Sequence, residues 1–375
     1  MNKKKIVFLT GTRADFGKLK PLIQKIDKSK NFECYIFVTG MHTLSKYGST
    51  YTEVKKLGFE RIFIFMNQTN TTDSEIILSN TISGFSNFIK EIKPNMIVVH
   101  GDRIETLAGA ITGSLNNILV SHIEGGELSG TIDEIIRHAV TKLSHIHFVA
   151  NNKAKERLIQ LGENQNHIFV IGSPDIDIMF SKNLPLIKNV KSHYKIPFNK
   201  YAIFIFHPVT TEINLLKHQI QKSVDALITS KKNYIVIYPN NDPGSDIILN
   251  EYKRLEKLNN FKIFPSIRFE NFLTLLKNSC FLIGNSSAGI RECEIYGIPT
   301  INIGSRQQNR SESKNIVNII PETNQIVKCI KTIDSLIIKK SHSFGDGKSS
   351  VRFYNLLINT KLWEIPIQKQ FVDMK

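Results

Sequence analysis

The sequence predicts an α/β protein made of two doubly wound domains. Short β-rich apolar runs alternate with amphipathic stretches, and this alternation stops once and then resumes. The first series of expected strands covers residues 6–10, 34–39, 61–65, 96–101, 119–123, 147–150 and 168–172. The second series covers residues 202–206, 234–238, 262–264, 281–284 and 300–303. Repeated strand–helix–strand units imply right-handed crossovers and parallel sheets.

The expected helices fill the gaps between these runs. They cover residues 18–28, 75–92, 106–115, 132–143 and 154–161, and then 215–229, 246–258, 269–277 and 288–296. A polar stretch with three prolines, residues 173–199, separates the two series and is typical of a linker. We therefore expect a first domain over residues 1–176, a second over 177–350, and a C-terminal helical segment over 351–375.

Composition excludes several classes of protein. The net charge is +16, but the lysines and arginines are scattered and no basic block follows residue 5. Aromatic platforms beside such blocks are missing too, which argues against nucleic-acid binding and favours a small anionic ligand. No apolar run approaches the length of a membrane span, and the first residues lack a signal-peptide pattern. We therefore expect a cytoplasmic protein without a membrane segment.

The four cysteines have no spacing typical of a metal site. We expect them to be buried, reduced thiols, and we expect neither a metal nor an organic cofactor.

Polar residues gather where the expected strands of the first domain end. The turn after the first strand contains glycine and carries Arg13 and Lys18 at the start of a helix, which suits an anion. The motif alone is weak, because a plain turn with surface charges has the same appearance.

Three carboxylates follow the fourth and fifth expected strands: Asp102, Glu124 and Asp133. A parallel sheet brings its carboxyl ends to one edge, so these acids predict a proton-transfer site. His42 and Arg103 follow strands of the same series.

The second domain repeats this arrangement. The polar residues after its strands are His207, Asn240, Arg268, Ser286, Ser287, Glu292, Arg306 and Arg310. The two serines can cap a helix and also donate to phosphate oxygens, whereas a carboxylate near the same helix can accept ribose hydroxyls.

Together these segments resemble the hydrolysing UDP-N-acetylglucosamine 2-epimerases of bacterial sialic acid synthesis. The resemblance covers nearly the whole chain and is carried by GTRADFGKLKP (11–21), VTGMH (38–42), HGDR (100–103), HIEGGELSGTIDEIIRHAVTKLSH (122–145), IGSPDID (171–177), FHPVTTE (206–212), YPNNDPG (238–244), PSIRFENF (265–272) and GNSSAGIRE (284–292). Non-hydrolysing relatives carry a GTRPE-type first loop and an HVEAGLR-type segment. The sequences at residues 11–15 and 122–128 therefore favour the hydrolysing branch.

The resemblance implies a GT-B-like fold, with two Rossmann-like domains, a cleft between them and a C-terminal helix crossing back to the first. It implies that Asp102, Glu124 and Asp133 are the essential acids. It places UDP mainly on the second domain, against His207, Asn240, Arg268, Ser286, Ser287, Glu292 and Arg306. Near the sugar or diphosphate it places Arg13, Lys18, His42 and Arg103. A homodimer or homotetramer is expected on the same basis.

The implied reaction converts UDP-N-acetylglucosamine and water into N-acetylmannosamine and UDP through a 2-acetamidoglucal, for sialic acid and surface polysaccharide synthesis. One alternative keeps the chemistry and changes the sugar to 2,4-diacetamido-2,4,6-trideoxyglucose, on the route to legionaminic acid. Another is a GT-B glycosyltransferase. The sequence does not assign which carboxylate is the base and which is the acid.

Overall fold

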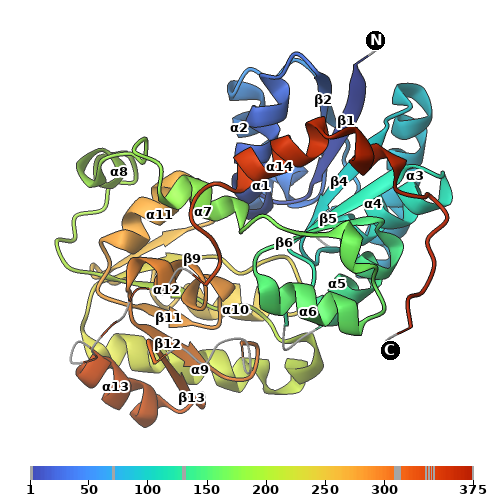
Figure 1. Cartoon of the computed structure of the whole chain (residues 1–375). Coiled ribbons are helices and arrows are strands. Elements are labelled where there is room, and N and C mark those ends of the chain that lie inside the picture. Colours follow the sequence, from blue (N-terminus) through green and yellow to red (C-terminus); the bar gives the residue numbers. More distant parts are fainter. Residues whose placement is uncertain are drawn as a thin grey trace. The chain divides into compact units, whose positions relative to one another are not determined.

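The computed structural model describes residues 3–69, 72–128, 132–307, 314–333, 336, 338, 340 and 343–373. The chain divides into two compact units (Figure 1). Unit 1 comprises Met1–Glu127, Asp133–Lys182 and Ser343–Lys375, and unit 2 comprises Leu128–Ile132 and Asn183–His342. Each unit holds one parallel sheet with helices on its faces, so the predicted fold class is confirmed.

The sheet of unit 1 has the strand order β3-β2-β1-β4-β5-β6-β7 within the described residues. Its strands are β1 (Lys4–Thr10), β2 (Phe32–Val38), β3 (Ile62–Ile64), β4 (Met96–His100), β5 (Leu119–Ile123), β6 (Ile146–Val149) and β7 (Ile168–Val170). All neighbouring strands pair in parallel. The order reverses between β1 and β4, which is where ligands bind in doubly wound folds.

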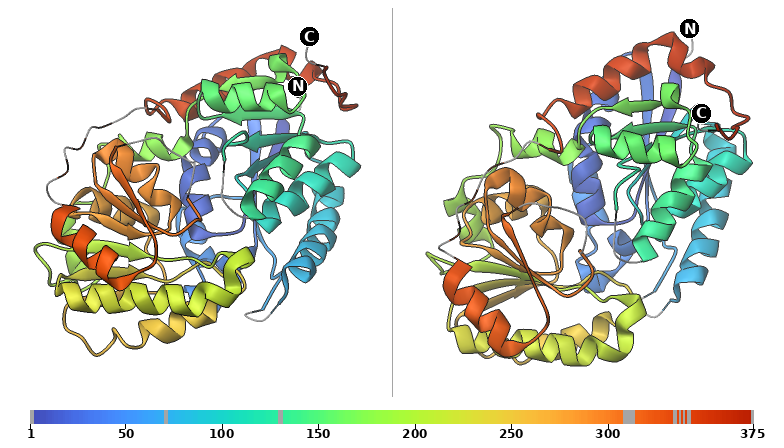
Figure 2. Two further views of the ribbon diagram at one scale, coloured as in Figure 1. Left: turned by 90° about the horizontal axis from the view of Figure 1, so that it is seen from below. Right: turned by 60° about the horizontal axis from the view of Figure 1, so that its bottom comes forward.

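Helices cover both faces of this sheet (Figure 2). One apolar cluster joins the sheet to α1 and α14, and another joins it to α3, α4 and α5. The helices of unit 1 are α1 (Arg13–Asp27), α2 (Tyr51–Lys56), α3 (Ser74–Ile92), α4 (Ile104–Leu115), α5 (Ile132–Leu143), α6 (Asn152–Gln160), α7 (Pro174–Met179) and α14 (Ser349–Ile358). Short 3-10 turns add η1 (Gly40–Thr43), η2 (Ser45–Tyr47), η3 (Gln165–His167) and η7 (Thr360–Glu364).

Unit 2 has the strand order β10-β9-β8-β11-β12-β13 in the part of the chain that is described. The strands are β8 (Ala202–Ile205), β9 (Tyr234–Ile237), β10 (Phe261–Phe264), β11 (Leu282–Gly284), β12 (Thr300–Ile303) and β13 (Ile316–Ile319). The helices are α8 (Ile187–His193), α9 (Ile213–Ser230), α10 (Ser245–Tyr252), α11 (Phe269–Lys277), α12 (Glu292–Tyr296) and α13 (Thr323–Thr332), with η4 (Thr210–Glu212) and η5 (Ser287–Gly289).

Two local expectations were wrong, and two elements were not predicted. The edge strand β13 and the helix α13 that follows it were not predicted. The expected linker over residues 173–199 contains α7 and α8, because Pro174 occupies the first helical turn, where its missing N–H costs nothing. The helix expected over residues 288–296 is divided into η5 and the short α12.

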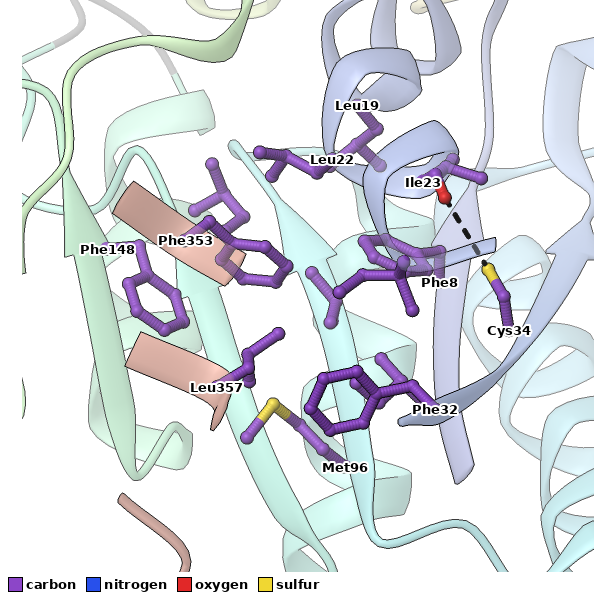
Figure 3. Close-up of a cluster of buried hydrophobic side chains, with 14 of the residues drawn as sticks. Phe8, Leu19, Leu22, Ile23, Phe32, Cys34, Met96, Phe148, Phe353 and Leu357 are labelled. Carbon is purple, nitrogen blue, oxygen red and sulfur yellow. Dashed lines mark hydrogen bonds between the residues drawn. The ribbon is translucent and has the colours of Figure 1, made fainter. Parts of the chain in front are cut away.

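The C-terminal segment contributes to the core of unit 1. Helix α14 packs against α1 and α7. Its Phe353 and Leu357 are fully buried and point into the cluster that contains Phe8 and Phe148 (Figure 3). The Phe353 ring lies 4.9 Å from that of Phe148 in an edge-on arrangement and 6.3 Å from that of Phe8. The last segment of the chain is therefore a structural part of its first domain.

The residues beyond α14 bind the end of α5. The Lys369 ammonium donates to the carbonyl oxygens of Thr141 and Ser144 at 2.8 and 2.7 Å, and it lies 2.5 Å from the Glu163 carboxylate. A cation at a helix C-terminus compensates the carbonyl groups that lack helical partners.

One glycine is required by close backbone contact in unit 2. Gly284, the last residue of β11, has φ +127°, and a Cβ atom there would lie 1.9 Å from the carbonyl oxygen of Ile205. Only glycine accommodates both the backbone conformation and this approach.

We predict that Phe353→Ala destabilises unit 1 by about 3–5 kcal/mol, because it removes a large buried ring and leaves a cavity. Urea unfolding followed by circular dichroism would measure this change. The matched control is Val351→Ala on the same helix, where the side chain is exposed and the expected change is within about 0.5 kcal/mol. Equal effects of the two substitutions would contradict the assigned role of Phe353.

Candidate functional site

The carboxyl edge of the unit 1 sheet carries a buried chain of charged side chains. Asp15 comes from the first turn of α1, His100 ends β4, and Glu124 follows β5. The Nδ1 atom of His100 lies 2.7 Å from Oδ1 of Asp15, and its Nε2 atom lies 3.1 Å from Oε2 of Glu124. We call these three residues the Asp15–His100–Glu124 chain. Each of the three side chains is less than a tenth exposed.

The turn between β1 and α1 fixes Asp15. Thr12 is the N-cap of α1, and its hydroxyl accepts the backbone N–H of Asp15 at 3.1 Å. The backbone N–H of Gly11 donates to the other carboxylate oxygen of Asp15 at 3.2 Å. Sequence reasoning passed over Asp15, although it lies inside the quoted first motif.

The two cations of this turn are held by carboxylates. Arg13 forms an ion pair with Glu53 of α2, and its Nε atom donates to that carboxylate at 3.0 Å. The Nζ atom of Lys18 lies 3.4 Å from the buried Asp175. Both predicted cations therefore lie at this edge of unit 1, each with an acidic neighbour.

Arg137 of α5 links two of the predicted acids. Its guanidinium donates to the carbonyl oxygen of Glu124 at 2.6 Å and forms an ion pair with Asp102. Asp133 lies one turn earlier on α5, so it shares the face of the helix that carries Arg137. The structure thus brings Asp102 and Glu124 to one guanidinium, and Arg137 is a site residue that sequence reasoning did not single out.

Glu124 is held at its backbone as well as at its carboxylate. Its φ of +63° is left-handed, which is uncommon for a residue with a side chain and costs energy. The hydroxyl of Ser173 donates to the Glu124 carboxylate, and the guanidinium of Arg137 donates to the Glu124 backbone carbonyl oxygen. Such an over-determined position is typical of functional sites.

Arg103 and His42 occupy different surroundings. Arg103 is the N-cap of α4, and its Nε atom lies 3.8 Å from the buried carboxylate of Glu105. His42 is buried, with its ring nitrogens 3.2 Å from the hydroxyl of Thr10 and 2.7 Å from that of Thr50.

Glu105 is a further residue that sequence reasoning missed. Its carboxylate packs against two glycines, because a Cβ at Gly11 or Gly40 would lie 2.9 or 2.5 Å from its atoms.

Three buried histidines near this edge differ in charge. Burial lowers the pKa of His100, but Glu124 and Asp15 outweigh it and raise that pKa to about 9. Burial lowers the pKa of His122, whose partners are the carbonyl of Gly101 and a threonine hydroxyl, to about 3. Burial also lowers the pKa of His42 to about 4. At neutral pH, His100 is therefore the cation among these three.

The carboxyl edge of the unit 2 sheet is organised around Asn285. Its side-chain amide exchanges hydrogen bonds with the backbone of His207, at 2.6 and 2.8 Å. The backbone N–H of Asn240 donates to Nδ1 of His207 at 3.0 Å. That nitrogen is therefore an acceptor, and any ring proton of neutral His207 is on Nε2.

Arg306 and Gln307, which follow β12, both donate to the carbonyl oxygen of Asn285, at 3.3 and 3.0 Å. This interaction gathers the ends of β8, β11 and β12 around one residue. Asn285 and Gln307 were missed by sequence reasoning, and Arg310 lies outside the described residues.

The remaining predicted residues of unit 2 follow the same strand ends. The hydroxyl of Ser286 accepts the backbone N–H of Ala288 at 3.3 Å, so this serine caps the turn η5 that begins at Ser287. Glu292 is buried at the start of α12. Arg268 follows β10, is half exposed, and lies 3.2 Å from Glu270.

Among the described residues, no group of three or more histidine, cysteine or acidic side chains is arranged to hold a metal ion. None of the helices in those same residues combines the length and apolar character needed to cross a membrane.

Comparison with known proteins identifies a family whose model matches this sequence. The family model for UDP-N-acetylglucosamine 2-epimerase matches residues 24–358. The chain is 46% identical over 375 residues to a UDP-N-acetylglucosamine 2-epimerase of Neisseria meningitidis serogroup B, covering 99% of both chains. It is 33% identical to the UDP-N,N'-diacetylbacillosamine 2-epimerase (hydrolyzing) of Legionella pneumophila, covering 99% of this chain and 98% of the other. It is 35% identical to the polysialic acid biosynthesis protein P7 of Escherichia coli, covering 99% and 95%.

A solved structure matches the fold over the same length. The UDP-GlcNAc 2-epimerase of Methanocaldococcus jannaschii, in complex with UDP-GlcNAc and UDP, has a TM-score of 0.80 at 22% identity. The match covers 94% of this chain and 99% of that one. At this identity, the likeness shows the fold.

We predict that the ring of His100 titrates near pH 9, because two carboxylates favour its charged form. The raised pKa means that the ion pairs stabilise the fold fully below about pH 6.5, and that this stabilisation is lost as pH rises through about 9. Nitrogen-15 NMR of the histidine rings would measure the midpoint. His122 is the control, since it is equally buried and should stay neutral throughout. A His100 midpoint at or below about 6.5 would contradict the assigned charge.

Proposed function

The chain belongs to the UDP-N-acetylglucosamine 2-epimerase family, and from this membership we propose that it is a hydrolysing member that converts UDP-N-acetylglucosamine and water into N-acetylmannosamine and UDP. Two acids of unit 1 carry this proposal, because Arg137 binds the carboxylate of Asp102 and the backbone carbonyl oxygen of Glu124 at the carboxyl edge of the sheet. Acids fixed in this way are suited to proton transfer.

Two observations favour the hydrolysing branch. The first loop has Ala14 and Asp15 after Arg13, and the segment after β5 continues from Glu124 with two glycines, as in the hydrolysing pattern. A Legionella relative that is 33% identical over nearly the whole chain is itself named as hydrolysing.

The chemistry requires a base and a stabilised leaving group. The hydrogen on carbon 2 of the sugar is not acidic, so its removal must accompany departure of UDP. We propose anti elimination, in which a base takes the proton, the carbon 1–carbon 2 double bond forms, and UDP leaves with the electrons of its bond to carbon 1. Water then adds its oxygen to carbon 1, and an acid delivers a proton to the opposite face of carbon 2. Asp102, Glu124 and Asp133 would supply the base, the acid and water activation, with the individual roles left open.

UDP would be held by the strand ends of unit 2. We propose contacts from His207, Asn240, Arg268, Ser286, Ser287, Glu292 and Arg306, with Arg13, Lys18, His42 and Arg103 of unit 1 near the sugar or the diphosphate. Cationic side chains and oriented N–H donors can neutralise the diphosphate as it leaves. No metal or organic cofactor is part of this proposal. A homodimer or homotetramer in the cytoplasm stays a prediction.

The runner-up substrate is the UDP derivative of 2,4-diacetamido-2,4,6-trideoxyglucose. The relatives named for diacetylbacillosamine are 33% and 30% identical to this chain. The higher identity, 46%, is to a relative named for N-acetylglucosamine, and we therefore favour that sugar. A GT-B glycosyltransferase would instead need a separate acceptor and would leave the carbon 2 hydrogen in place.

We predict that turnover of UDP-N-acetylglucosamine in deuterated water gives UDP and N-acetylmannosamine with one deuterium at carbon 2. Elimination discards the original hydrogen, and the proton that returns comes from solvent. Mass spectrometry and proton NMR of the purified sugar would measure the label. A product with hydrogen retained at carbon 2 would rule out the elimination route, and faster turnover of the diacetamido sugar would favour the runner-up.

We further predict that Asp102→Asn lowers kcat by about 10²–10⁴-fold while UDP still binds, because the amide keeps the shape but cannot exchange the proton. UDP release and calorimetric titration with UDP would measure the two effects. Asp225→Asn is the matched control, since Asp225 forms an exposed ion pair with Arg254 in unit 2 and its loss should leave kcat unchanged. An active Asp102→Asn enzyme would remove Asp102 from the catalytic set.

A further inference from the structure

His100 stands out because both of its ring nitrogens face carboxylates. Asp15 lies at 2.7 Å on one side and Glu124 at 3.1 Å on the other. An ionised carboxylate accepts hydrogen bonds only, and a neutral imidazole has a single N–H. A ring with such an oxygen close to each of its nitrogens is favoured as an imidazolium, which agrees with a pKa raised by those carboxylates to about 9.

The other charged and titratable groups around His100 come from several elements. His122 of β5 is buried and neutral. The charges of Asp15 and Arg13 act on the neutral His42 in opposite directions, since Asp15 raises the His42 pKa and Arg13 lowers it. Arg137 of α5 donates to the backbone carbonyl oxygen of Glu124. Lys18 of α1 is paired with Asp175. The Glu124 carboxylate lies 3.1 Å from Nε2 of His100, so it meets this cation directly.

Two of the three predicted acids, Asp102 and Glu124, are thus supported in different ways. Asp102 has its carboxylate paired with Arg137, a permanent cation. Glu124 has its carboxylate between His100 and the hydroxyl of Ser173. Because the Glu124 backbone is also held in a left-handed conformation, its carboxylate has little freedom to reorient. His100 is the part of this support that can lose its charge.

We propose that His100 is a positioning residue for Glu124: Asp15 orients the imidazolium through Nδ1, and Nε2 fixes the carboxylate of Glu124 in the direction that proton transfer requires. This inference rests on the proposed function and assigns a role that the reaction scheme leaves open. His100 itself does not exchange a proton with the sugar in this arrangement. Its contribution is to orient an acid and to compensate that acid's charge in a buried place.

The test compares two amides at position 100. In His100→Gln the side-chain amide can take the place of Nε2 and present an N–H to the Glu124 carboxylate. In His100→Asn the shorter amide can replace Nδ1 and reach Asp15 only. Both substitutions remove the same charge from the same buried place, so a merely structural role predicts equal losses.

We expect His100→Asn to lower kcat by about 10²-fold, as for a misplaced catalytic group, and His100→Gln to lower it by about tenfold or less. KM for UDP-N-acetylglucosamine should change by less than about threefold in both, because unit 2 holds the nucleotide in the proposal. His218→Gln is the background control. It removes a His–Glu contact of 3.6 Å from the exposed surface of unit 2 and should leave kcat unchanged.

A second measurement covers the case in which the position 100 variants do not fold. Asp15→Asn removes one carboxylate beside His100, so the His100 pKa should fall. If His100 must be charged to position Glu124, the alkaline limb of kcat should move to lower pH by the same amount as the His100 midpoint seen by nitrogen-15 NMR. In the wild type the two midpoints should also coincide.

Equal losses in His100→Gln and His100→Asn, full activity in both, or an alkaline limb that does not follow the His100 midpoint would overturn the inference. An inactive wild type would instead refute the proposed function, and the inference with it. Wild-type turnover is therefore measured first, so that the two failures are distinguished.

Discussion

The parallel pairing of strands is the constraint on which the rest of this structure depends. Because every neighbouring pair is parallel, each strand of unit 1 delivers its last residue to the same edge of the sheet. His100 at the end of β4 and Glu124 after β5 are 24 positions apart in numbering, yet their side chains meet at 3.1 Å. Unit 2 uses the same constraint to gather His207, Asn285 and Arg306.

The alternation of apolar runs was sufficient to predict both sheets, since the strands with strong apolar runs are buried on both faces. The same signal failed to predict an edge strand and two short helices. β13 is an edge strand whose residues are only partly buried, and the short helices α7 and α8 lie in a proline-containing stretch that has no long amphipathic pattern. Elements that contribute little to a core leave little trace in hydrophobic periodicity.

The sequence could predict which residues follow the strand ends, but it could not predict the contacts that these residues make. Residues directly after strands, such as Asp102 and Glu124, could be found because strand ends can be read from sequence. Arg137, Glu105 and Ser173 could not, because their roles arise from contacts between distant segments. The hydroxyl of Ser173, for example, meets a carboxylate 49 residues away. His100 belongs to a quoted motif, but only the geometry reveals that carboxylates face both of its nitrogens.

The burial of α14 in unit 1 has a consequence for the order in which the two units can complete their folding. A nascent chain emerges from the ribosome beginning at its N-terminus, and domains generally fold as units during synthesis. Phe353 and Leu357 belong to the core formed by β1, β4 and α1, but they emerge after the whole of unit 2. The domain that begins first is therefore completed only after unit 2 has been synthesised, and its core at Phe8 and Phe148 lacks these two side chains until α14 emerges.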